Sequence, residues 1–299
     1  MRKTDGVVQG KTMKKRILSV ILVISMMILA VGCAKKSEGD SKGDGNNSGN
    51  TNQSEDPGNK ETNKNEENQE PVTILVAAAA SMQPSLEELK TLFQDKHSWI
   101  TVEGTYDSSG KLQTQIEEGL EADVFLSAAV KQMNALKEKR MIEEDTIIQL
   151  LENKVVLIVP NNVESKVTGF DDILNADQIA IGDPASVPAG QYAKEIFDNL
   201  GIFSKVEEKA SFGTNVTEVL NWVAEGSADA GVVYATDAAT TDKVVVVANA
   251  PDGTLKAPVI YPIGIVSASQ KKEAAKLYVE FLQSGEAKAV FEKYGFLAK

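Results

Sequence analysis

The sequence has little of what most catalytic and metal sites require. Its 299 residues contain one cysteine, Cys33, and one histidine, His97. A single cysteine excludes an intrachain disulfide and a cysteine-based metal site, and a single histidine argues against His-rich zinc or iron sites. The net charge of −12 argues against nucleic-acid binding, because nucleic-acid binders need a basic face to displace counterions.

Nucleotide-binding motifs are also missing. The chain has neither a GxGxxG nor a GxxxxGK(S/T) pattern, the glycine loops that hold phosphates in many cofactor sites. Without a cysteine nucleophile, and with the one histidine at a predicted helix end, nucleophilic catalysis has little support. An enzyme of the cell surface is therefore the weakest of our hypotheses, and we predict a protein that is not an enzyme and has no cofactor.

The longest apolar run is too short to serve as a permanent membrane span. The basic cluster Lys14–Arg16 precedes Ile17–Val31, fifteen residues with only two serines, whereas a bilayer-spanning helix needs ~20 residues. A basic segment, a short apolar segment and small residues before a cleavage point are typical of a secretory signal peptide. We therefore predict that residues 1–32 are a signal peptide.

The cysteine stands directly after this segment. Ala30-Val31-Gly32-Cys33 resembles the bacterial lipobox, in which the cysteine is lipidated and becomes the new N-terminus. The resemblance implies an extracytoplasmic protein anchored to the cell membrane by lipid on Cys33. The alternative is a plain signal peptide with an incidental cysteine. Translation starts at Met1 or at Met13, just before the basic cluster.

The next segment is polar. Residues 34–70 contain no aromatic residue and, apart from Ala34, no hydrophobic one, so they cannot bury enough apolar surface to offset the entropy of ordering. We predict that residues 33–70 are the lipidated cysteine and a flexible tether spanning roughly 30–37 Å.

The rest of the chain is strongly acidic. Residues 1–32 carry a net charge of +5 and the polar segment carries −4, which leaves −13 on the remainder. Because a field of this sign repels anions, local dipoles must hold any bound anion.

The remaining residues, 71–299, alternate strand and helix patterns. This alternation predicts an α/β fold with mostly parallel sheets, and about 229 residues suit two lobes. Ser85 and Glu88 form a capping-box pattern, which predicts that a helix starts at Ser85. The predicted strands cover residues 72–76, 100–106, 122–127, 155–159, 178–181, 231–234, 244–247 and 259–266. The predicted helices cover residues 85–93, 112–118, 131–139, 188–200, 216–224 and 272–282.

Several predicted junctions between a strand and a helix carry hydroxyl groups or small residues that expose the backbone. Ligands of parallel sheets bind at the carboxyl ends of the strands, where helix N-termini point. Helix N-termini bind anions through free N–H groups and the helix dipole, and hydroxyl groups add neutral donors. The junctions are Ala80-Ser81, Ser108–Gly110, Val187–Gly190 and Gly213–Val216.

These junctions lie within motifs that together resemble the molybdate-binding proteins of ABC import systems. The resemblance covers nearly all of residues 71–299, and its most specific block runs from Gly182 to Ala193. The motifs are Ala77–Ser81, Ser108–Leu112, Ala122–Phe125, Gly182–Pro184, Val187–Ala193, Gly231–Tyr234 and Tyr294–Phe296.

The resemblance implies five ligand-binding positions, which contact the oxygens of an oxyanion and are not direct metal ligands. Ser81 and Ser109 match hydroxyl donors of the first lobe. Ala189 and Val216 match positions that present backbone N–H groups of the second lobe, and Tyr234 matches a phenol that closes the site.

The resemblance also implies architecture and partners. We expect a periplasmic-binding-protein type II-like fold whose lobe I comprises residues 71–157 plus 241–299 and whose lobe II comprises residues 158–240. Each lobe is a mixed, mostly parallel sheet flanked by helices, and the ligand cleft lies between them. We expect a monomer that captures molybdate or tungstate and delivers it to the permease subunits of an ABC transporter. The alternative is the same scaffold binding another oxyanion, such as sulfate, or a small organic anion.

Two departures from the family pattern bear on the site. Asp107 precedes the serine pair where the family has small neutral residues, and Ala128-Ala129 replaces the usual Ala-Asp. A carboxylate that points into the cleft would repel an anion. We expect Asp107 to point away, because the adjacent serines occupy the turn that faces the site.

Overall fold

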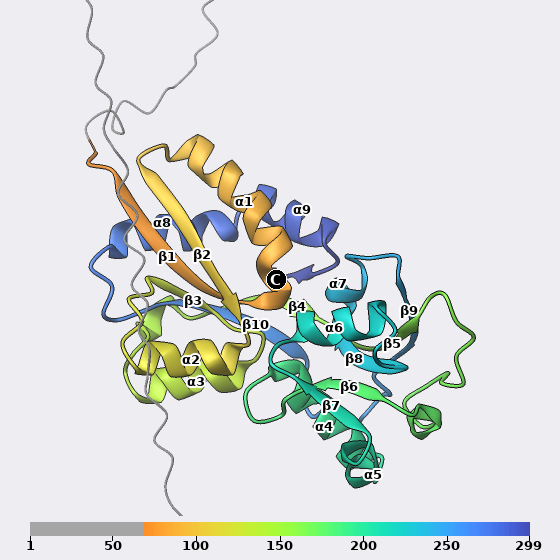
Figure 1. Cartoon of the computed structure of the whole chain (residues 1–299). Coiled ribbons are helices and arrows are strands. Elements are labelled where there is room, and N and C mark those ends of the chain that lie inside the picture. Colours follow the sequence, from red (N-terminus) through yellow and green to blue (C-terminus); the bar gives the residue numbers. More distant parts are fainter. Residues whose placement is uncertain (1–68) are drawn as a thin grey trace, which may run out of the picture. The chain divides into compact units, whose positions relative to one another are not determined.

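The computed structural model describes residues 69–299 (Figure 1). The predicted signal peptide, Cys33 and nearly all of the predicted tether lie outside the described residues. None of the helices within residues 69–299 has the length and apolar character needed to cross a bilayer.

The first of two sheets has six strands in the order β11-β4-β10-β3-β1-β2. β1 pairs parallel with β2 and β3, and β10, β4 and β11 continue the sheet with antiparallel pairs. The parallel strands β1 and β2 end beside each other at Ala79 and Asp107, so the segments that follow them start at one edge. The strands are β1 (Val72–Ala79), β2 (Ile100–Asp107), β3 (Val124–Leu126), β4 (Ile148–Asn153), β10 (Val259–Ile265) and β11 (Leu297–Ala298).

Helices cover both faces of this sheet. Figure 1 shows α1, α8 and α9 on one side of β1 and β2, and α2 and α3 on the other. On the first side Phe93 packs edge-on against Tyr278, with ring centroids 5.1 Å apart; on the second, Leu112, Phe125 and Met133 form a separate buried cluster. The helices are α1 (Gln83–Lys96), α2 (Ser109–Glu117), α3 (Val130–Glu138), α8 (Lys272–Leu282) and α9 (Gly285–Lys293).

The second sheet has five strands in the order β7-β6-β8-β5-β9. β6 pairs parallel with β7 and β8, whereas β5 pairs antiparallel with β8 and β9. The strands are β5 (Val155–Pro160), β6 (Ile179–Gly182), β7 (Ala210–Gly213), β8 (Ala230–Tyr234) and β9 (Val244–Asn249), and the helices are α4 (Pro188–Asn199), α5 (Phe203–Glu207), α6 (Val216–Ala224) and α7 (Ala235–Ala238). Helices α4 and α6 pack on β5, β6 and β8.

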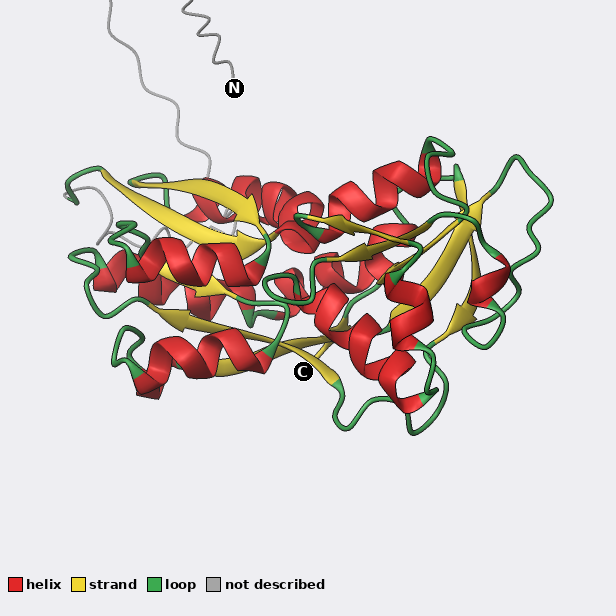
Figure 2. Ribbon diagram, turned by 60° about the horizontal axis from the view of Figure 1, so that its bottom comes forward, coloured by secondary structure: helices red, strands yellow, loops and turns green. Residues whose placement is uncertain are grey.

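The two mixed sheets with their flanking helices confirm the predicted two-lobed α/β fold, and Figure 2 shows the two groups of strands among the helices. The chain passes between the sheets twice, at Lys154 and through residues 250–258. The strands that follow the two passages, β5 and β10, pair antiparallel with their neighbours. The sheets therefore contain fewer parallel strand pairs than the alternating strand and helix pattern of the sequence predicts. The sheets also change at other residues than the expected lobe boundaries: β5 pairs with β8 and with β9, so both β5 and β9 belong to the second sheet.

Two predicted helix starts are wrong. The helix predicted from residue 112 begins at Ser109, as α2, and the start predicted at Ser85 is also too late. Helix α1 begins at Gln83, two residues before Ser85, and no side chain caps it. Ser85 instead lies in the first turn, where its hydroxyl donates to the carbonyl of Met82 at 2.9 Å. Pro84 explains the earlier start, because a proline fits the first turn of a helix, where its missing N–H has no partner to lose.

Candidate functional site

A small cavity lies between the two lobes, and all five sequence-predicted positions border it. Its volume of about 10 Å³ is close to the room that one water molecule needs, so the site suits a compact ion and not an organic molecule of many atoms. The lining residues are Ala79, Ala80, Ser81, Asp107, Ser108, Ser109 and Ala128 from the first lobe, and Val187, Pro188, Ala189, Val216 and Tyr234 from the second.

Three helix N-termini converge on this cavity. Ser109 is the first residue of α2, Ala189 the second of α4 and Val216 the first of α6. The first N–H groups of a helix have no partner within it, and the structure gives the Ala189 and Val216 N–H groups no acceptor among the described residues. The helix dipoles add positive potential at the same point. The arrangement therefore favours negative charge without a Lys or Arg in the lining.

The hydroxyls of the two serines each contact a polar group of the first lobe. The hydroxyl of Ser109 accepts the Ala128 N–H at 2.9 Å, which leaves its own proton free for another acceptor. The hydroxyl of Ser81 lies 3.0 Å from the phenol oxygen of Tyr261. Both serines are buried, so they are shielded from bulk water.

Tyr234 ends β8 and contributes an unpaired phenol. Its hydroxyl is buried and has no hydrogen-bond partner among the described residues, an arrangement that is costly unless a ligand or water completes it. Burial raises the pKa of Tyr234 well above 10, so the group stays neutral and able to donate. Its ring packs edge-on against Tyr192 and Tyr261, at centroid distances of 6.4 and 5.6 Å.

Asp107 is the one acidic residue that borders the cavity. Its carboxylate accepts the Ser108 N–H at 2.7 Å and lies 3.3 Å from the ammonium of Lys111. From the sequence we expected Asp107 to point away from the cleft. The structure places the residue at the cavity, with its carboxylate bound to the start of α2 and its charge paired with a lysine.

A second acid lies near the site, and the sequence reasoning missed it. Asp237, in α7 three residues after Tyr234, is 5% exposed, and its Oδ2 has no partner among the described residues. Burial raises the pKa of Asp237 from 3.8 to about 7. The carboxyl group therefore holds its proton to near neutral pH. No local pattern marks the residue, because its burial arises from the packing of α7 against α6, β5, β8 and β9.

The lobes touch directly beside the cavity. The N–H of Gly110, in α2, donates to the carbonyl of Ser186 in the second lobe at 2.9 Å. A Cβ on Gly110 would lie 2.3 Å from that carbonyl oxygen, so only glycine allows this approach. The amide of Gln132 donates to Gln191 across the same boundary at 3.3 Å. These contacts describe a closed arrangement of the two lobes.

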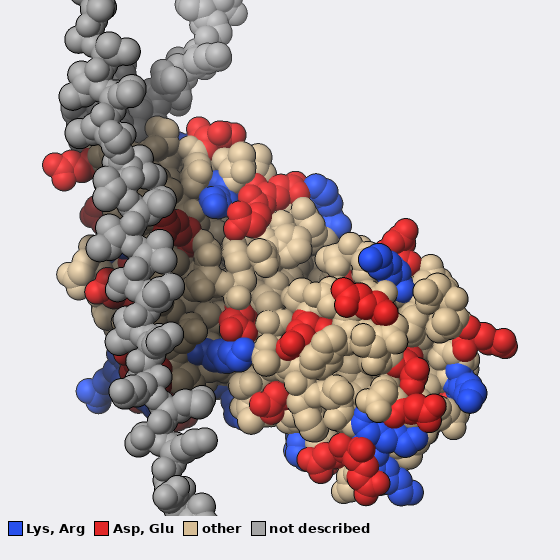
Figure 3. All heavy atoms as spheres, in the orientation of Figure 1, with Lys and Arg blue, Asp and Glu red and all other residues tan. Residues whose placement is uncertain are grey.

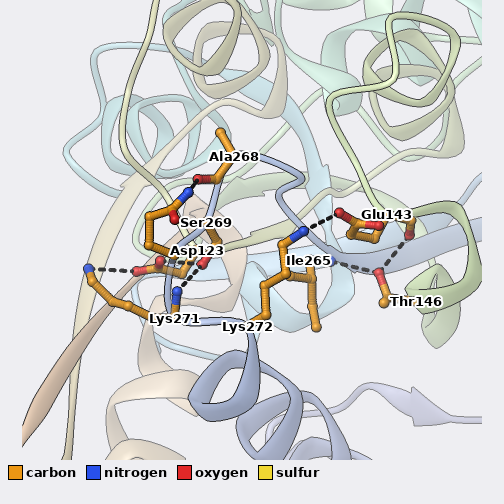
Figure 4. Close-up of polar contacts among 9 residues, drawn as sticks. Asp123, Glu143, Thr146, Ile265, Ala268, Ser269, Lys271 and Lys272 are labelled. Carbon is orange, nitrogen blue, oxygen red and sulfur yellow. Dashed lines mark hydrogen bonds and ion pairs between the residues drawn. The ribbon is translucent and has the colours of Figure 1, made fainter.

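A larger cavity of about 760 Å³ lies elsewhere in the first lobe, beside Asp123. Figure 4 shows Asp123 against the loop between β10 and α8, held by Ser269 and Lys271. Its carboxylate accepts from the Ser269 hydroxyl at 2.6 Å, from the Leu75 N–H at 2.7 Å and from the Lys271 ammonium at 3.2 Å. These bonds occupy both oxygens, so the carboxylate serves to hold the loop.

Surface charge does not distinguish the site. On the face that Figure 3 shows, acidic and basic side chains are interspersed, without a continuous basic area. Within residues 69–299, no three His, Cys, Asp or Glu side chains are grouped so that they could hold a metal ion. What distinguishes the site is a small cavity between two α/β lobes whose lining combines neutral donors with a single acid, Asp107. This combination defines a solute-binding receptor.

The chain belongs to the family of bacterial extracellular solute-binding proteins, whose model matches residues 74–297. Members of this family are transport proteins that work outside the cytoplasm, and the prediction that the protein is not an enzyme is confirmed.

Individual relatives cover most of the chain. It is 42% identical over 233 residues to the putative ABC transporter substrate-binding lipoprotein YvgL of Bacillus subtilis (strain 168), a match covering 78% of this chain and 89% of YvgL. It is 36% identical over 231 residues to the molybdate-binding protein ModA of Haemophilus influenzae, covering 76% and 90%. The solved substrate binding domain of a putative molybdenum ABC transporter from Clostridium difficile superposes with a TM-score of 0.59 at 36% identity, covering 76% and 99%.

Proposed function

We propose that the protein captures molybdate, and the nearly isosteric tungstate, and delivers it to an ABC permease. The observation that carries the proposal is a set of neutral donors around one small cavity that have no acceptor among the described residues: the hydroxyls of Ser109 and Tyr234 and the N–H groups of Ala189 and Val216. Ser81 completes the five proposed contacts. The names of the H. influenzae and C. difficile relatives support the same ligand.

The chemistry of the lining supports an oxyanion that carries no proton. Molybdate is a tetrahedral dianion with four acceptor oxygens, so a cavity that offers donors matches it at every contact. Phosphate carries a proton near pH 7 and needs an acceptor for it. The one acidic residue of the lining is Asp107, and its Oδ1 receives both the Ser108 N–H and the Lys111 ammonium; the discrimination that we propose requires that Oδ2 does not face the ligand.

Size supplies the second filter. Sulfate also carries no proton, but its shorter bonds would lengthen each hydrogen bond in a fixed set of donors, and hydrogen-bond energy falls with length. Hydrogen bonds to a charged acceptor contribute about 1.5–3 kcal/mol each. Five such contacts contribute about 7.5–15 kcal/mol. A sub-micromolar Kd requires more than about 8.2 kcal/mol after the entropic cost of binding, so it is reached in the upper part of this range.

Thermal unfolding with a panel of oxyanions tests the ligand. A ligand at ~1,000 times its Kd adds about 4.1 kcal/mol to the free energy of unfolding, which raises Tm by roughly 8–16 °C for a domain of this size. We expect this rise with molybdate and with tungstate, and little change with sulfate or phosphate. A rise with sulfate alone would establish the alternative oxyanion, and a flat response to all four would overturn the proposal.

Anchoring and delivery form a separate part of the proposal. Lipid on Cys33 would keep the receptor at the membrane surface beside its permease, and the name of the B. subtilis relative includes both a lipoprotein and an ABC transporter. Cell fractionation of a Cys33→Ser variant tests the anchor. We expect the wild-type protein in the membrane fraction and the variant in the soluble fraction or the medium; equal distribution of the two would contradict the anchor and leave the ligand proposal intact.

A further inference from the structure

A chain of buried hydrogen bonds leads from the backbone near the passage between the lobes to Ser81. Asn153 ends β4, and Lys154 alone separates it from β5. The amide nitrogen of Asn153 lies 3.2 Å from the phenol oxygen of Tyr261, and that oxygen lies 3.0 Å from the hydroxyl of Ser81. Asn153, Tyr261 and Ser81 are all buried, so water does not compete with these bonds.

A backbone N–H fixes the direction of the first bond. The N–H of Lys154 donates to Oδ1 of Asn153 at 2.8 Å. A backbone N–H can only donate, so this contact identifies the oxygen side of the amide. The other side is therefore Nδ2, which donates to the hydroxyl of Thr236 at 2.9 Å and to Tyr261 at 3.2 Å.

The direction then passes to the phenol and on to the serine. The Tyr261 oxygen accepts from Asn153, so its own proton needs an acceptor, and Ser81 is the one that the described residues provide. If Ser81 donated to Tyr261 instead, the phenol proton would remain buried without a partner, at a cost of about 1–3 kcal/mol. Tyr261 is fully buried, and burial raises its pKa well above 10, so it keeps the proton that it donates.

We propose that Asn153 and Tyr261 are positioning residues that hold the Ser81 hydroxyl as a hydrogen-bond donor towards the ligand, and so strengthen the preference of the site for oxyanions that carry no proton. With its oxygen occupied by Tyr261, Ser81 directs its own proton into the cavity. The hydroxyl of Ser109 is held as a donor by a single contact, because the Ala128 N–H donates to its oxygen. The inference rests on the proposed function, since it assumes an oxyanion in the cavity.

A double-mutant cycle in the full-length protein, purified in mild detergent, tests the coupling. Kd values for molybdate and phosphate are measured by titration calorimetry for the wild type, Tyr261→Phe, Ser81→Ala and the double variant. We expect Tyr261→Phe to raise the Kd for molybdate about tenfold, with a smaller change for phosphate, because a freely rotating Ser81 can accept the phosphate proton. In the Ser81→Ala background the same substitution should change the Kd by about twofold or less.

A second variant reverses the chain of donors without removing the phenol. Asn153→Asp keeps the acceptor for Lys154 but replaces the donor facing Tyr261 with an acceptor. The phenol then donates to Asp, Ser81 donates to the phenol, and a lone pair faces the ligand, so we expect a rise in Kd of more than about a hundredfold. A matched control is Tyr278→Phe, which removes the hydroxyl of another buried tyrosine, packed against Phe93, and should leave the Kd unchanged.

The outcomes separate this inference from the proposed function. A wild-type protein that binds none of the oxyanions overturns both. In a second outcome, the wild type binds molybdate, but Tyr261→Phe raises the Kd equally with and without Ser81. The tyrosine would then act through packing, so this result overturns the positioning role and leaves the proposed function standing. The inference is supported if Tyr261→Phe raises the Kd for molybdate only when Ser81 is present, and if the variant has a lower ratio of molybdate to phosphate affinity than the wild type.

Discussion

The two lobes present donors to the same cavity by different means. The first lobe uses the side chains of Ser81 and Ser109, each oriented by another donor of that lobe. The second lobe uses backbone N–H groups at Ala189 and Val216, where α4 and α6 begin, and adds the phenol of Tyr234. A side-chain donor can be deleted by one substitution, whereas a backbone N–H survives almost any substitution. Substitutions can therefore delete both donors of the first lobe, whereas in the second lobe they can delete only the phenol of Tyr234.

The largest effect is expected from removing both side-chain donors of the first lobe. Ser81→Ala combined with Ser109→Ala deletes two hydrogen bonds to a charged acceptor, at about 1.5–3 kcal/mol each, so the Kd for molybdate should rise about 10²- to 10⁴-fold. Calorimetry measures the change, and circular dichroism checks the fold. A loss below about fivefold would mean that the backbone donors of the second lobe carry the binding.

The next effect concerns stability and compares the buried acids of the two lobes. Asp123 has three donors in the first lobe, whereas Oδ2 of Asp237, in the second, has none. Because its folded-state pKa is raised to about 7, native Asp237 keeps a proton between pH 4 and 7 that the unfolded chain releases. The free energy of unfolding should therefore fall by about 4 kcal/mol as pH rises through this window, at ~1.4 kcal/mol per pKa unit.

Asp237→Asn removes that titration. Denaturant unfolding at pH 4 and at pH 8 should show the variant gaining stability relative to the wild type at the higher pH. Asp123→Asn is the matched control, and it should lose stability at pH 8, because the new amide group meets donors and not acceptors. An identical pH slope for Asp237→Asn and the wild type would mean that Asp237 is solvated or paired in solution.

A smaller loss is expected from blocking the contact between the lobes. Gly110→Ala places a Cβ against the Ser186 carbonyl, and such overpacking costs about 1–3 kcal/mol, so the Kd should rise about 5- to 150-fold. The open form has no such clash, and the Tm without ligand should change little. Small-angle scattering with and without molybdate measures closure; an unchanged compaction in the variant would show that Gly110 is not required for it.

The smallest effect is expected at the backbone donors. Val216→Ala trims a buried side chain but keeps its N–H, so the Kd for molybdate should change by about twofold or less while Tm falls because packing is lost. The measurement is the same calorimetric titration. A tenfold loss of affinity would show that the side chain shapes the cavity, and the contrast between the lobes would then be weaker than we infer.

The sequence was most informative where the signal is local. The junctions that contain Ser81, Ser109, Ala189 and Val216 follow strands and lead into helices, so element order was enough to place these segments at the carboxyl ends of the strands. The family resemblance then singled out the individual residues. The lobe boundaries were less accessible, because β5 owes its place to pairing with β8 and β9 owes its place to pairing with β5, which no local pattern reports. Among the short or peripheral elements, β4, β7, β11 and α9 were not predicted.

The partners of the site residues were out of reach for the same reason. Tyr261 lies 180 residues from Ser81 along the chain. Glycine is required at position 110 because the carbonyl group of Ser186, in the other lobe, approaches it closely. The capping pattern at Ser85 was misleading because Pro84 allowed α1 to begin before it. Burial of Asp237 and orientation of Ser81 are products of tertiary packing, so the structure was needed to see them.

The absence of Lys and Arg from the cavity lining has a consequence for the response to ionic strength. Most anion sites contain cations, and added salt weakens them by screening that attraction. Here the folded part carries a net charge of −13, so the long-range force on an approaching dianion is repulsive, while the hydrogen bonds that hold it are short-ranged and shielded. Salt screens the repulsion beyond about 10 Å at 0.1 M. The association rate should therefore rise with salt, opposite to the behaviour of a receptor that attracts its anion by charge.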